Sequence, residues 1–551
     1  MKKIFILIIS LLFLFAMVAC SNESSSNTNK NDSKSNKNKK QNTPQDTVNI
    51  VMWSAPDTFN PYFSQGNYGK YAGGELVLDT LLDYDPNFNY THALAKGYTI
   101  SDDGLIYTFK LDENATWHDG EPFTAADVAF TFKSIMDPEW TGTGYVNLSL
   151  VKGAKEYKEG KAEDVPGIQI VNDHTIKVTL VSPYAPFLEA LGKGLWILPE
   201  HAFANVKPAD MATADFSKNP IGTGPVKFVK YATDQYVEYE ANDKYFLGAP
   251  QFTKLILRIM TPDLALAAFE AGEIHATTRT GIGTINITDH KKIQELPNVN
   301  VTVFDTMSYQ TMTVNTTKPY LSNKKVRKAI MYAIDRKAIV EQLLQGKGKI
   351  AYGPIAEESP WFNKNLPTYE YDPKQAKKLL EEAGWDFSRE LQLSVPKGNL
   401  IRERSAPLIQ QYLQDIGMKV KLEFMDFPTL MNLMEKQELD MALLGTSTGM
   451  VDPDSNIYPF FNSSQLRPTG WNTASFKDSK IDELLEAGAV ETDQSKRKQI
   501  YDEVQEIAVD ELPYIYLYYE QSIGAVSKDL KNAVPNQVGI EWNIYDWTFN
   551  E

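Results

Sequence analysis

The chain has 551 residues, a formal net charge of −16, and 42% hydrophobic and 11% aromatic residues. One hydrophobic core rarely organises more than about 250–300 residues, so this length predicts two or three domains. The acidic balance argues against a nucleic-acid partner, because a phosphate-binding surface needs clustered Lys and Arg. Repulsion at this charge favours a soluble monomer.

The N-terminus has the pattern of an export signal. Two lysines precede an apolar run over residues 4–18, which is shorter than the roughly 20 residues that span a bilayer. The run ends in MVAC at residues 17–20, which resembles a lipoprotein cleavage box with Met where Leu is preferred. We expect residues 1–19 to be a signal peptide and Cys20, the only cysteine, to carry a diacylglycerol anchor. The alternative is a short buried helix with an ordinary core cysteine.

The segment after Cys20 has the composition of a tether. Residues 21–46 are rich in Ser, Asn and Lys and lack aromatic residues, so they cannot bury enough apolar surface to fold. We expect residues 20–46 to connect the lipidated cysteine to the folded part, on the extracytoplasmic face of the cell membrane.

The first folded segments predict a strand and then a small α+β module. Residues 48–53 read as a strand, and residues 73–82 as a helix. Alternating apolar residues over 105–111 predict a half-buried strand after the Asp103-Gly104 turn. Thr124 and Asp127 have the spacing of a capping box before an apolar helical stripe. A second hairpin is predicted from the alternation over 167–170 and 175–180.

The middle of the chain continues with strands and one helix. Gly222-Thr223-Gly224 lacks the Gly-Lys-Ser/Thr that closes a phosphate-binding loop, and Pro225 removes one amide, so we expect a tight turn into a strand. Further elements are predicted as strands over 237–240 and 254–259 and a helix over 262–270.

From about residue 305 helices and strands alternate. An apolar stripe over 326–334 predicts a helix, Asp335 caps the next one, and Asp372-Pro373 starts another. The remaining predicted elements are helices over 405–416, 429–436, 479–490 and 494–509 and strands over 419–424, 439–444 and 514–519, the last apolar on both faces and so interior. Successive helix–strand units predict a mostly parallel, helix-covered sheet.

One motif imitates an enzyme. Gly445-Thr446-Ser447-Thr448-Gly449 fits the G-x-S-x-G elbow of serine hydrolases, which requires a helix directly after the serine and a later histidine. Here Pro453 follows closely, and all six histidines precede Ser447 (His92, His118, His174, His201, His275, His290). The same histidines are isolated, with no two spaced three or four residues apart as metal ligands on one helix. We therefore predict no catalytic residue, no metal and no cofactor.

The string SDDGLIYTFKLDENATWHDGEPFTAADV, from Ser101, closely resembles the signature of the family 5 extracellular solute-binding proteins, the receptors of ABC importers for oligopeptides, dipeptides and nickel. GTGPVKF from Gly222, AGEIH from Ala271 and VRKAIMYAIDRKAIV from Val326 resemble the family too, so the resemblance spans about 48–547. It implies an α/β, periplasmic-binding-protein-like two-lobe fold of type II with an inserted α+β subdomain. The implied parts are lobe I (47–79, 199–305 and 520–551), the inserted subdomain (80–198) and lobe II (306–519).

The predicted ligand site follows the strand over 439–444. Ligands bind at the carboxyl ends of strands in open α/β sheets, and the small residues Gly445, Thr446 and Ser447 leave backbone groups free to pair with an extended peptide. The resemblance also implies an aspartate beyond this strand that pairs with the ligand's α-amino group. Asp454 is the first candidate and Asp452 the second, although Asp452 before Pro453 is equally explained as a helix cap. Aromatic candidates at the cleft are Trp53, Tyr62, Tyr309, Trp361 and Trp471.

The sequence thus predicts a lipid-anchored receptor that delivers oligopeptides to the transmembrane subunits of an ABC importer. Its lobes are expected to close on the ligand by bending near 305–307 and 518–521. A nickel, haem or sugar receptor on the same fold is the alternative among binding proteins. A secreted serine hydrolase that uses Ser447 is the alternative from another class.

Overall fold

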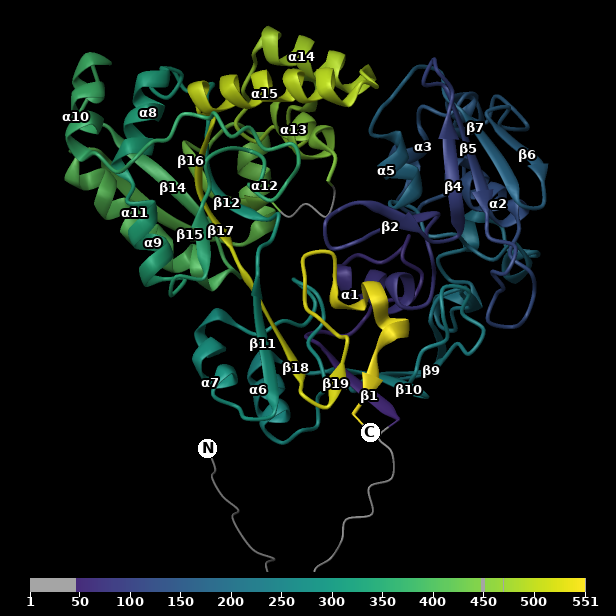
Figure 1. Ribbon diagram of the computed structural model, residues 1–551. Coiled ribbons are helices and arrows are strands. Elements are labelled where there is room, and N and C mark those ends of the chain that lie inside the picture. The colour runs from purple at the N-terminus through teal and green to yellow at the C-terminus, as the bar shows by residue number, and fades with distance from the viewer. Residues whose placement is uncertain (1–45, 447–450, 469, 551) are drawn as a thin grey trace, which may run out of the picture. The chain divides into compact units, whose positions relative to one another are not determined.

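The computed structural model describes residues 46–446, 451–468 and 470–550 (Figure 1). The predicted signal peptide, Cys20, almost all of the predicted tether, and Ser447 lie outside these residues. Among the described residues, no helix combines the length and the apolar composition that a bilayer-crossing segment needs.

Lobe I is organised around a four-stranded sheet in the order β1 (Thr47–Met52), β10 (Lys254–Ile259), β9 (Tyr236–Ala241) and β8 (Val226–Ala232). β1 runs parallel to β10, and the other pairs are antiparallel. β11 (Val299–Phe304) pairs with β18 (Ser522–Ser527), and Ala276 bridges both Ile50 and Val526. Helices α6 (Pro262–Glu270) and α7 (His290–Gln294) accompany these strands, so the first, middle and last parts of the chain share one body.

The inserted subdomain is an antiparallel sheet in the order β4 (Ala95–Ile100), β5 (Ile106–Leu111), β7 (Thr175–Thr179) and β6 (Ile168–Asn172). Helix α2 (Ala125–Met136) packs on it, and the predicted capping box is confirmed by the bonds between Thr124 and Asp127. Its other elements are β2 (Leu82–Tyr84), β3 (Tyr90–His92), α3 (Tyr145–Leu148), α4 (Ala154–Lys158) and α5 (Phe187–Gly192). The buried cluster around Phe109, Trp117 and Phe132 extends from Tyr62 to Phe216, and the boundaries 80 and 198 stay a prediction.

The helix predicted over residues 73–82 is wrong. The helical segment lies earlier, as α1 (Asn67–Gly69) and a π-helical turn over Lys70–Glu75. A Cβ at Gly73 would lie 1.9 Å from the Phe59 carbonyl oxygen, so this segment needs glycine for a close backbone approach. Thr80 then forms a bridge with Trp196, and this tertiary pairing draws the chain into an extended course before β2.

Lobe II contains a six-stranded sheet in the order β13 (Gly348–Ile350), β17 (Tyr514–Glu520), β12 (Tyr309–Val314), β16 (Met441–Thr446), β14 (Glu390–Pro396) and β15 (Lys419–Met425). The prediction of a mostly parallel sheet is wrong, because β12 pairs antiparallel with both β16 and β17. The parallel pairs of this sheet are β14 with β15 and β14 with β16. The reason is the chain path: the chain enters lobe II along β12 and leaves it along β17, so these adjacent strands must run in opposite directions.

Helices cover this sheet, as predicted. They are α8 (Lys324–Ala333), α9 (Arg336–Gln342), α10 (Pro373–Glu382), α11 (Leu400–Asp415), α12 (Phe427–Glu435), α13 (Pro453–Phe461), α14 (Ser479–Val490) and α15 (Gln494–Glu511). The predicted caps Asp335 and Asp372 are confirmed. β17 is buried along almost its whole length, as an interior strand requires.

Two short connections join lobe I to lobe II, at residues 305–308 and at Gln521. Thr306 Oγ1 donates to the Glu520 carbonyl (2.8 Å), and Gln521 Nε2 donates to Asp305 Oδ1 (2.8 Å). The connections therefore lie side by side at the positions predicted for the hinge, and the bending itself stays a prediction. The short strands β19 (Leu530–Lys531) and β20 (Thr548–Phe549) end the fold.

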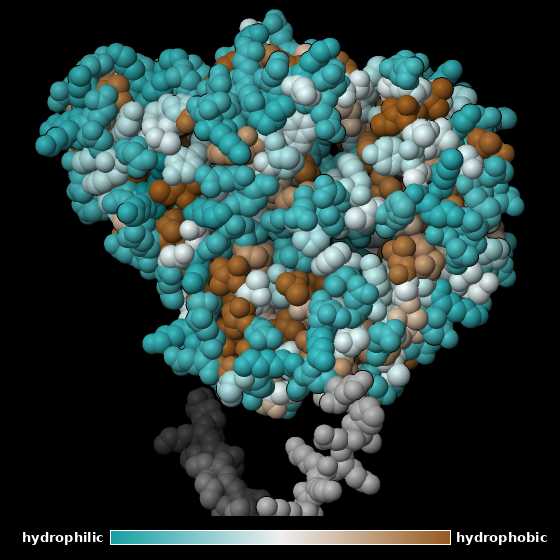
Figure 2. Space-filling view, viewed as in Figure 1, coloured by the Kyte–Doolittle hydropathy of each residue, from teal (hydrophilic) through white to brown (hydrophobic). Residues whose placement is uncertain are grey.

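The surface of the molecule in the view of Figure 2 is mostly hydrophilic. Figure 2 shows one face of the molecule, on which hydrophilic side chains predominate and apolar side chains gather in small separate patches. Patches of this kind are normal for a soluble protein.

Candidate functional site

Four predicted site residues come together at the end of β16. Gly445 and Thr446 pair with Gln310 and Tyr309 of β12. Tyr309, Gly445, Thr446 and Trp471 line one cavity of about 50 Å³. The rest of its wall is aromatic and aliphatic, with three threonines (Phe427, Leu444, Phe460, Phe461, Tyr514, Thr311, Thr313 and Thr473).

β16 has a free backbone edge beside this cavity. Its pairing with β12 continues to Thr446, but it pairs with β14 only at Met441 and Ala442. In the described part of the chain, Leu444 to Thr446 therefore have no strand partner on the β14 side. Such an edge exposes N–H and C=O groups to which an extended chain can add as a strand.

Arg402 lies next to this edge, and sequence reasoning missed it. A Cβ at Gly445 would lie 2.9 Å from Arg402 Nη2, so glycine leaves room for the guanidinium. Arg402 Nε donates to Gln310 Oε1 (3.0 Å), and its two Nη groups have no hydrogen-bond partner among the described residues. Burial lowers the pKa of Arg402 below its usual value, and the neighbouring Tyr518 and Glu520 only partly oppose this lowering.

The helix start explains why Arg402 was missed. The predicted helix begins at Ser405, whereas α11 begins at Leu400 with Asn399 as its cap. Asn399 Oδ1 accepts from the Arg402 N–H (2.8 Å) and so places Arg402 in the first turn, after the carboxyl end of β14. The asparagine after Gly398 was the signal that could have found this start.

Asp452 is the N-cap of α13, so its interpretation as a helix cap is confirmed. Its side chain accepts from the Asp454 N–H (2.9 Å). Its carboxylate also forms a bidentate ion pair with Arg497, with N–O distances of 2.6 and 2.7 Å. The Arg497 guanidinium lies over the rings of Trp361 and Tyr501, at 5.1 and 5.2 Å.

Asp454 also has protein partners. It is 4% exposed, and its two oxygens accept from the hydroxyls of Tyr501 (2.7 Å) and Tyr184 (3.3 Å). Burial raises the pKa of Asp454 to about 6, against the lowering effect of the Tyr501 bond. A carboxylate offers about four acceptor positions, so an ammonium group would have to share Asp454 with two tyrosines. The amine-anchor role of Asp454 or Asp452 stays a prediction.

Three predicted aromatic residues do not line this cavity, namely Trp361, which lies beside Arg497, and Tyr62 and Trp53. Tyr62 is buried in the subdomain cluster, where its hydroxyl donates to the Trp196 carbonyl (2.5 Å) and its ring packs on Trp140. Trp53 follows β1 in lobe I, and its backbone N–H donates to the Ile282 carbonyl (2.9 Å). No pattern in the sequence relates the position of these rings to the end of β16.

A larger, polar cavity of about 480 Å³ lies where the segment after β1, the β2–β3 hairpin and the C-terminal segment meet. Two of its acids make internal contacts: Glu75 pairs with Arg279 (2.6 Å), and Asp79 accepts from Thr223 and Tyr245. Burial raises the pKa of Asp79 to about 6. None of the predicted site residues lines this cavity.

The residues after β16 and the arrangement of metal-binding side chains bear on the hydrolase and nickel alternatives. Among the described residues, the first helix after β16 is α13, which begins at Pro453, whereas a hydrolase elbow requires a helix directly after the serine. Over residues 46–446, 451–468 and 470–550, no group of three or more His, Cys, Asp or Glu side chains is arranged to hold a metal ion.

Two relatives are similar in sequence to this chain over almost its whole length. Oligopeptide-binding protein AppA of Bacillus subtilis is 28% identical, over 92% of both chains. Heme-binding protein A of Haemophilus influenzae is 30% identical, over 88% of this chain and 89% of its own.

Solved structures agree with these relatives, and each matches 92% of this chain and 100% of its own. CtaP from Listeria monocytogenes, an ABC transporter substrate-binding protein, has a TM-score of 0.81 at 28% identity. NikZ from Campylobacter jejuni in complex with Ni(L-His) has a TM-score of 0.75 at 28% identity. AppA from Bacillus subtilis in complex with a nonapeptide has a TM-score of 0.73 at 26% identity.

The family model described as "Bacterial extracellular solute-binding proteins, family 5 Middle" matches residues 89–467, more than half of the chain. The two-lobe periplasmic-binding-protein fold implied by the resemblance is confirmed by the structural neighbours. The chain belongs to family 5 of the bacterial extracellular solute-binding proteins.

Proposed function

We propose that this protein captures oligopeptides outside the cytoplasm and delivers them to the transmembrane subunits of an ABC importer. The observation that carries the proposal is the free backbone edge at Leu444 to Thr446. A peptide that adds there as a strand is held through its main chain, which gives affinity without reading its sequence. The adjacent cavity would take one apolar side chain of the peptide, and the Arg402 Nη groups, which have no partner among the described residues, would pair with a carboxylate of the peptide.

Closure completes the mechanism. The ligand contacts the lobes more extensively when they approach, so it stabilises the closed state by its differential affinity for that state. The adjacent connections at residues 305–308 and Gln521 supply the hinge. Binding of this kind uses no catalytic residue and no cofactor, and the acidic chain acts as a monomer.

Two relatives are named with other ligands: NikZ is in complex with Ni(L-His), and heme-binding protein A of Haemophilus influenzae is named for haem. The deciding experiment is native mass spectrometry of the purified protein with a mixture of peptides, Ni(L-His) and haem. We expect retained masses that match peptides of several sequences. Retention of the nickel complex or haem in place of peptides would overturn the proposal. Labelling of Ser447 by a fluorophosphonate would favour the serine hydrolase.

The amine-anchor prediction has a sharp test. An ammonium group removed from water needs a facing carboxylate, and loss of one partner of a buried charge pair costs about 2–5 kcal/mol. If Asp454 is the anchor, Asp454→Asn weakens free-amine peptides roughly 30-fold or more, whereas N-acetylated peptides change far less. Calorimetric titration of both peptides against the parent, Asp454→Asn and Asp452→Asn measures this. Equal losses for both peptides would leave Asp454 the structural role that Tyr184 and Tyr501 already give it.

The membrane anchor is proposed from the sequence alone. If Cys20 carries the lipid, Cys20→Ala releases the folded protein into the medium with ligand binding intact, because residues 4–18 are too short to span a bilayer. Fractionation of cells and medium with an antibody measures the outcome, and Ser21→Ala is the matched control. A Cys20→Ala protein that stays in the membrane fraction would contradict the anchor.

A further inference from the structure

The inserted subdomain and lobe II meet at a buried carboxylate. Glu189 of α5 is 1% exposed. Its Oε1 accepts from the Val451 N–H (2.6 Å) and from the Tyr84 hydroxyl (2.6 Å), and its Oε2 accepts from the Asp452 N–H (2.9 Å). Tyr84 belongs to the subdomain, whereas the two N–H groups belong to lobe II at the start of α13. One carboxylate therefore binds both bodies.

Two further hydrogen bonds join the same surfaces. The Tyr184 hydroxyl donates to Asp454 Oδ2 (3.3 Å), and the Ala185 N–H donates to the Ala489 carbonyl at the end of α14 (2.8 Å). Residues 184–189 thus contact two successive helices of lobe II. We call the contacts of Tyr184, Ala185 and Glu189 with lobe II the clasp.

The clasp is coupled to the candidate site by chain connectivity. Val451 and Asp452 follow shortly after Thr446, the last described residue of β16, and precede α13. Asp452 is held from the other side by Arg497. Movement of lobe II away from the subdomain would therefore break all four hydrogen bonds of the clasp at once, and would expose Glu189.

We propose that Glu189 is a positioning residue for ligand capture: it joins the inserted subdomain to lobe II in the closed receptor, and so favours closure without touching the ligand. The inserted subdomain then contributes to closure together with lobe I and lobe II. This goes beyond the proposed function, because it holds for any ligand that closes the lobes.

Truncation of Glu189 has a predictable effect. Glu189→Ala leaves two buried N–H groups and one hydroxyl without an acceptor, and each buried unsatisfied group disfavours the state that buries it. We expect the ligand-free protein to shift toward the open state and peptide affinity to fall roughly 10- to 100-fold. Glu189→Gln keeps the Oε1 acceptor and loses only the bond to Asp452, so its effect should be intermediate.

The experiment measures closure directly. Spin labels at Val146→Cys, on the exposed surface of the subdomain, and at Glu486→Cys, on exposed α14, report the distance between the bodies in the Cys20→Ala full-length chain. Hydrogen exchange at Val451 and Asp452 reports the clasp itself. Glu189→Ala should lengthen the mean distance and speed the exchange. Glu156→Ala, an exposed glutamate of α4, is the matched control and should change neither.

Tyr184→Phe provides a second variant if Glu189→Ala fails to fold. It removes one bond of the clasp and leaves the packing of the ring intact, so it should shift distance and exchange in the same direction by a smaller amount. Unchanged distance and exchange in the Glu189 variants would overturn the proposal, and so would a loss of affinity with an unchanged distance. If the parent binds no peptide, the proposed function fails while distance and exchange still decide the clasp.

The pH dependence of the open population separates the positioning role of the Glu189 carboxyl from a role in packing alone. Burial raises the pKa of Glu189, and the nearby charge of Asp452 raises it further, whereas the hydrogen bonds from Tyr84 and Val451 oppose the shift. Burial also raises the pKa of Asp454 to about 6. The other titratable or charged groups that face the clasp are Tyr84, Tyr90, Tyr184, Arg497 and Tyr501.

The sign follows from proton linkage. A carboxyl whose pKa is higher in the joined state takes up a proton on joining, so closure is favoured at low pH and weakens as pH rises through the raised pKa. We expect the open population of the parent to grow as pH rises from about 4, the ordinary range of a carboxyl pKa, through about 6, the raised pKa of Asp454. The growth should be smaller in Glu189→Gln, which retains only Asp454. Identical profiles in the parent and Glu189→Gln would contradict the role of this carboxyl.

Discussion

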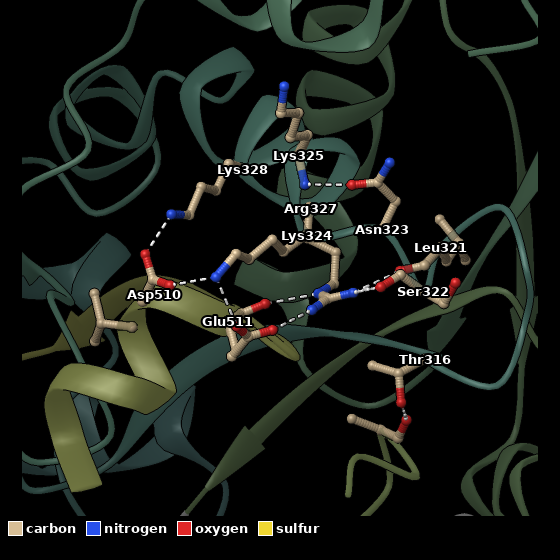
Figure 3. A network of polar contacts seen from close by, with 12 residues as sticks. Thr316, Leu321, Ser322, Asn323, Lys324, Lys325, Arg327, Lys328, Asp510 and Glu511 are labelled. Atoms are coloured by element: carbon tan, nitrogen blue, oxygen red, sulfur yellow. Dashed lines mark hydrogen bonds and ion pairs between the residues drawn. The ribbon is translucent and has the colours of Figure 1, made fainter. Parts of the chain in front are cut away.

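Replacement of Arg327 by methionine is expected to lower the free energy of unfolding of lobe II by about 3–5 kcal/mol. Figure 3 shows Arg327 of α8 pointing toward Glu511 at the end of α15. The side chain is 2% exposed, and its Nε donates to the Glu511 carbonyl (2.7 Å). Nη1 donates to the carbonyls of Leu321 (2.9 Å) and Ser322 (2.7 Å), and Nη2 pairs with Glu511 Oε2 (3.1 Å).

The size of this effect comes from the groups that are left behind. Methionine fills much of the space but donates nothing, so three backbone carbonyls lose their partner inside the protein. Glu511 keeps only its pair with Lys324 (2.9 Å). Lys325→Met is the control, because Lys325 and Glu382 form a pair of half-exposed side chains, and such surface pairs contribute about 0–1 kcal/mol. Urea unfolding followed by hydrogen exchange of α8 and α15 measures both variants, and equal midpoints would contradict the prediction.

Arg497→Met is expected to have a comparable effect on stability, about 3–5 kcal/mol, and to weaken ligand binding as well. Arg497 is 4% exposed, donates to the Gly488 carbonyl (2.8 Å) and neutralises Asp452 through two short bonds. Without it, Asp452 becomes an uncompensated, mostly buried charge at the start of α13. Because Asp452 is the N-cap of α13, the start of this helix beside the candidate site loses its fixed position.

A double variant identifies the cause. Asp452→Asn combined with Arg497→Met removes both charges, so it should recover part of the stability lost in Arg497→Met. Lys498→Met is the control for α15, since Lys498 pairs with Asp502 within the helix at a partly exposed position. Urea unfolding and calorimetric titration with one peptide measure the set. An Arg497→Met protein as stable as Lys498→Met would contradict the prediction.

The elements that were predicted correctly are specified by short stretches of sequence. α6 and α14 have the predicted bounds, and the capping residues Thr124, Asp335 and Asp372 act within one turn of their helices. A strand was predicted over 439–444 from its apolar run, and the carboxyl-edge rule then placed the candidate site directly after it. The observed β16 is Met441–Thr446, so Gly445 and Thr446 belong to the strand itself. A local pattern suffices for such features because the interacting groups are neighbours in the chain.

The features that were missed depend on distant partners. The antiparallel course of β12 follows from the order in which the chain visits the lobes, which no periodicity records. Asp454 meets Tyr184, 270 residues away, so its environment could not be read from its neighbours. Arg402 was hidden because a helix start was placed at Ser405, a boundary error that removed it from the carboxyl edge of β14.

The pairing of β11 with β18 means that lobe I can be completed only after the last strands of the chain have been synthesised. Lobe I contains β1, the first strand to be synthesised, but Ala276 and Ile285 pair with Val526 and Ile523 near the other end of the chain. Lobe II and the subdomain are nearly continuous in sequence, so their strands can pair earlier. The apolar strands of lobe I therefore stay exposed to aggregation until the C-terminal strands are available.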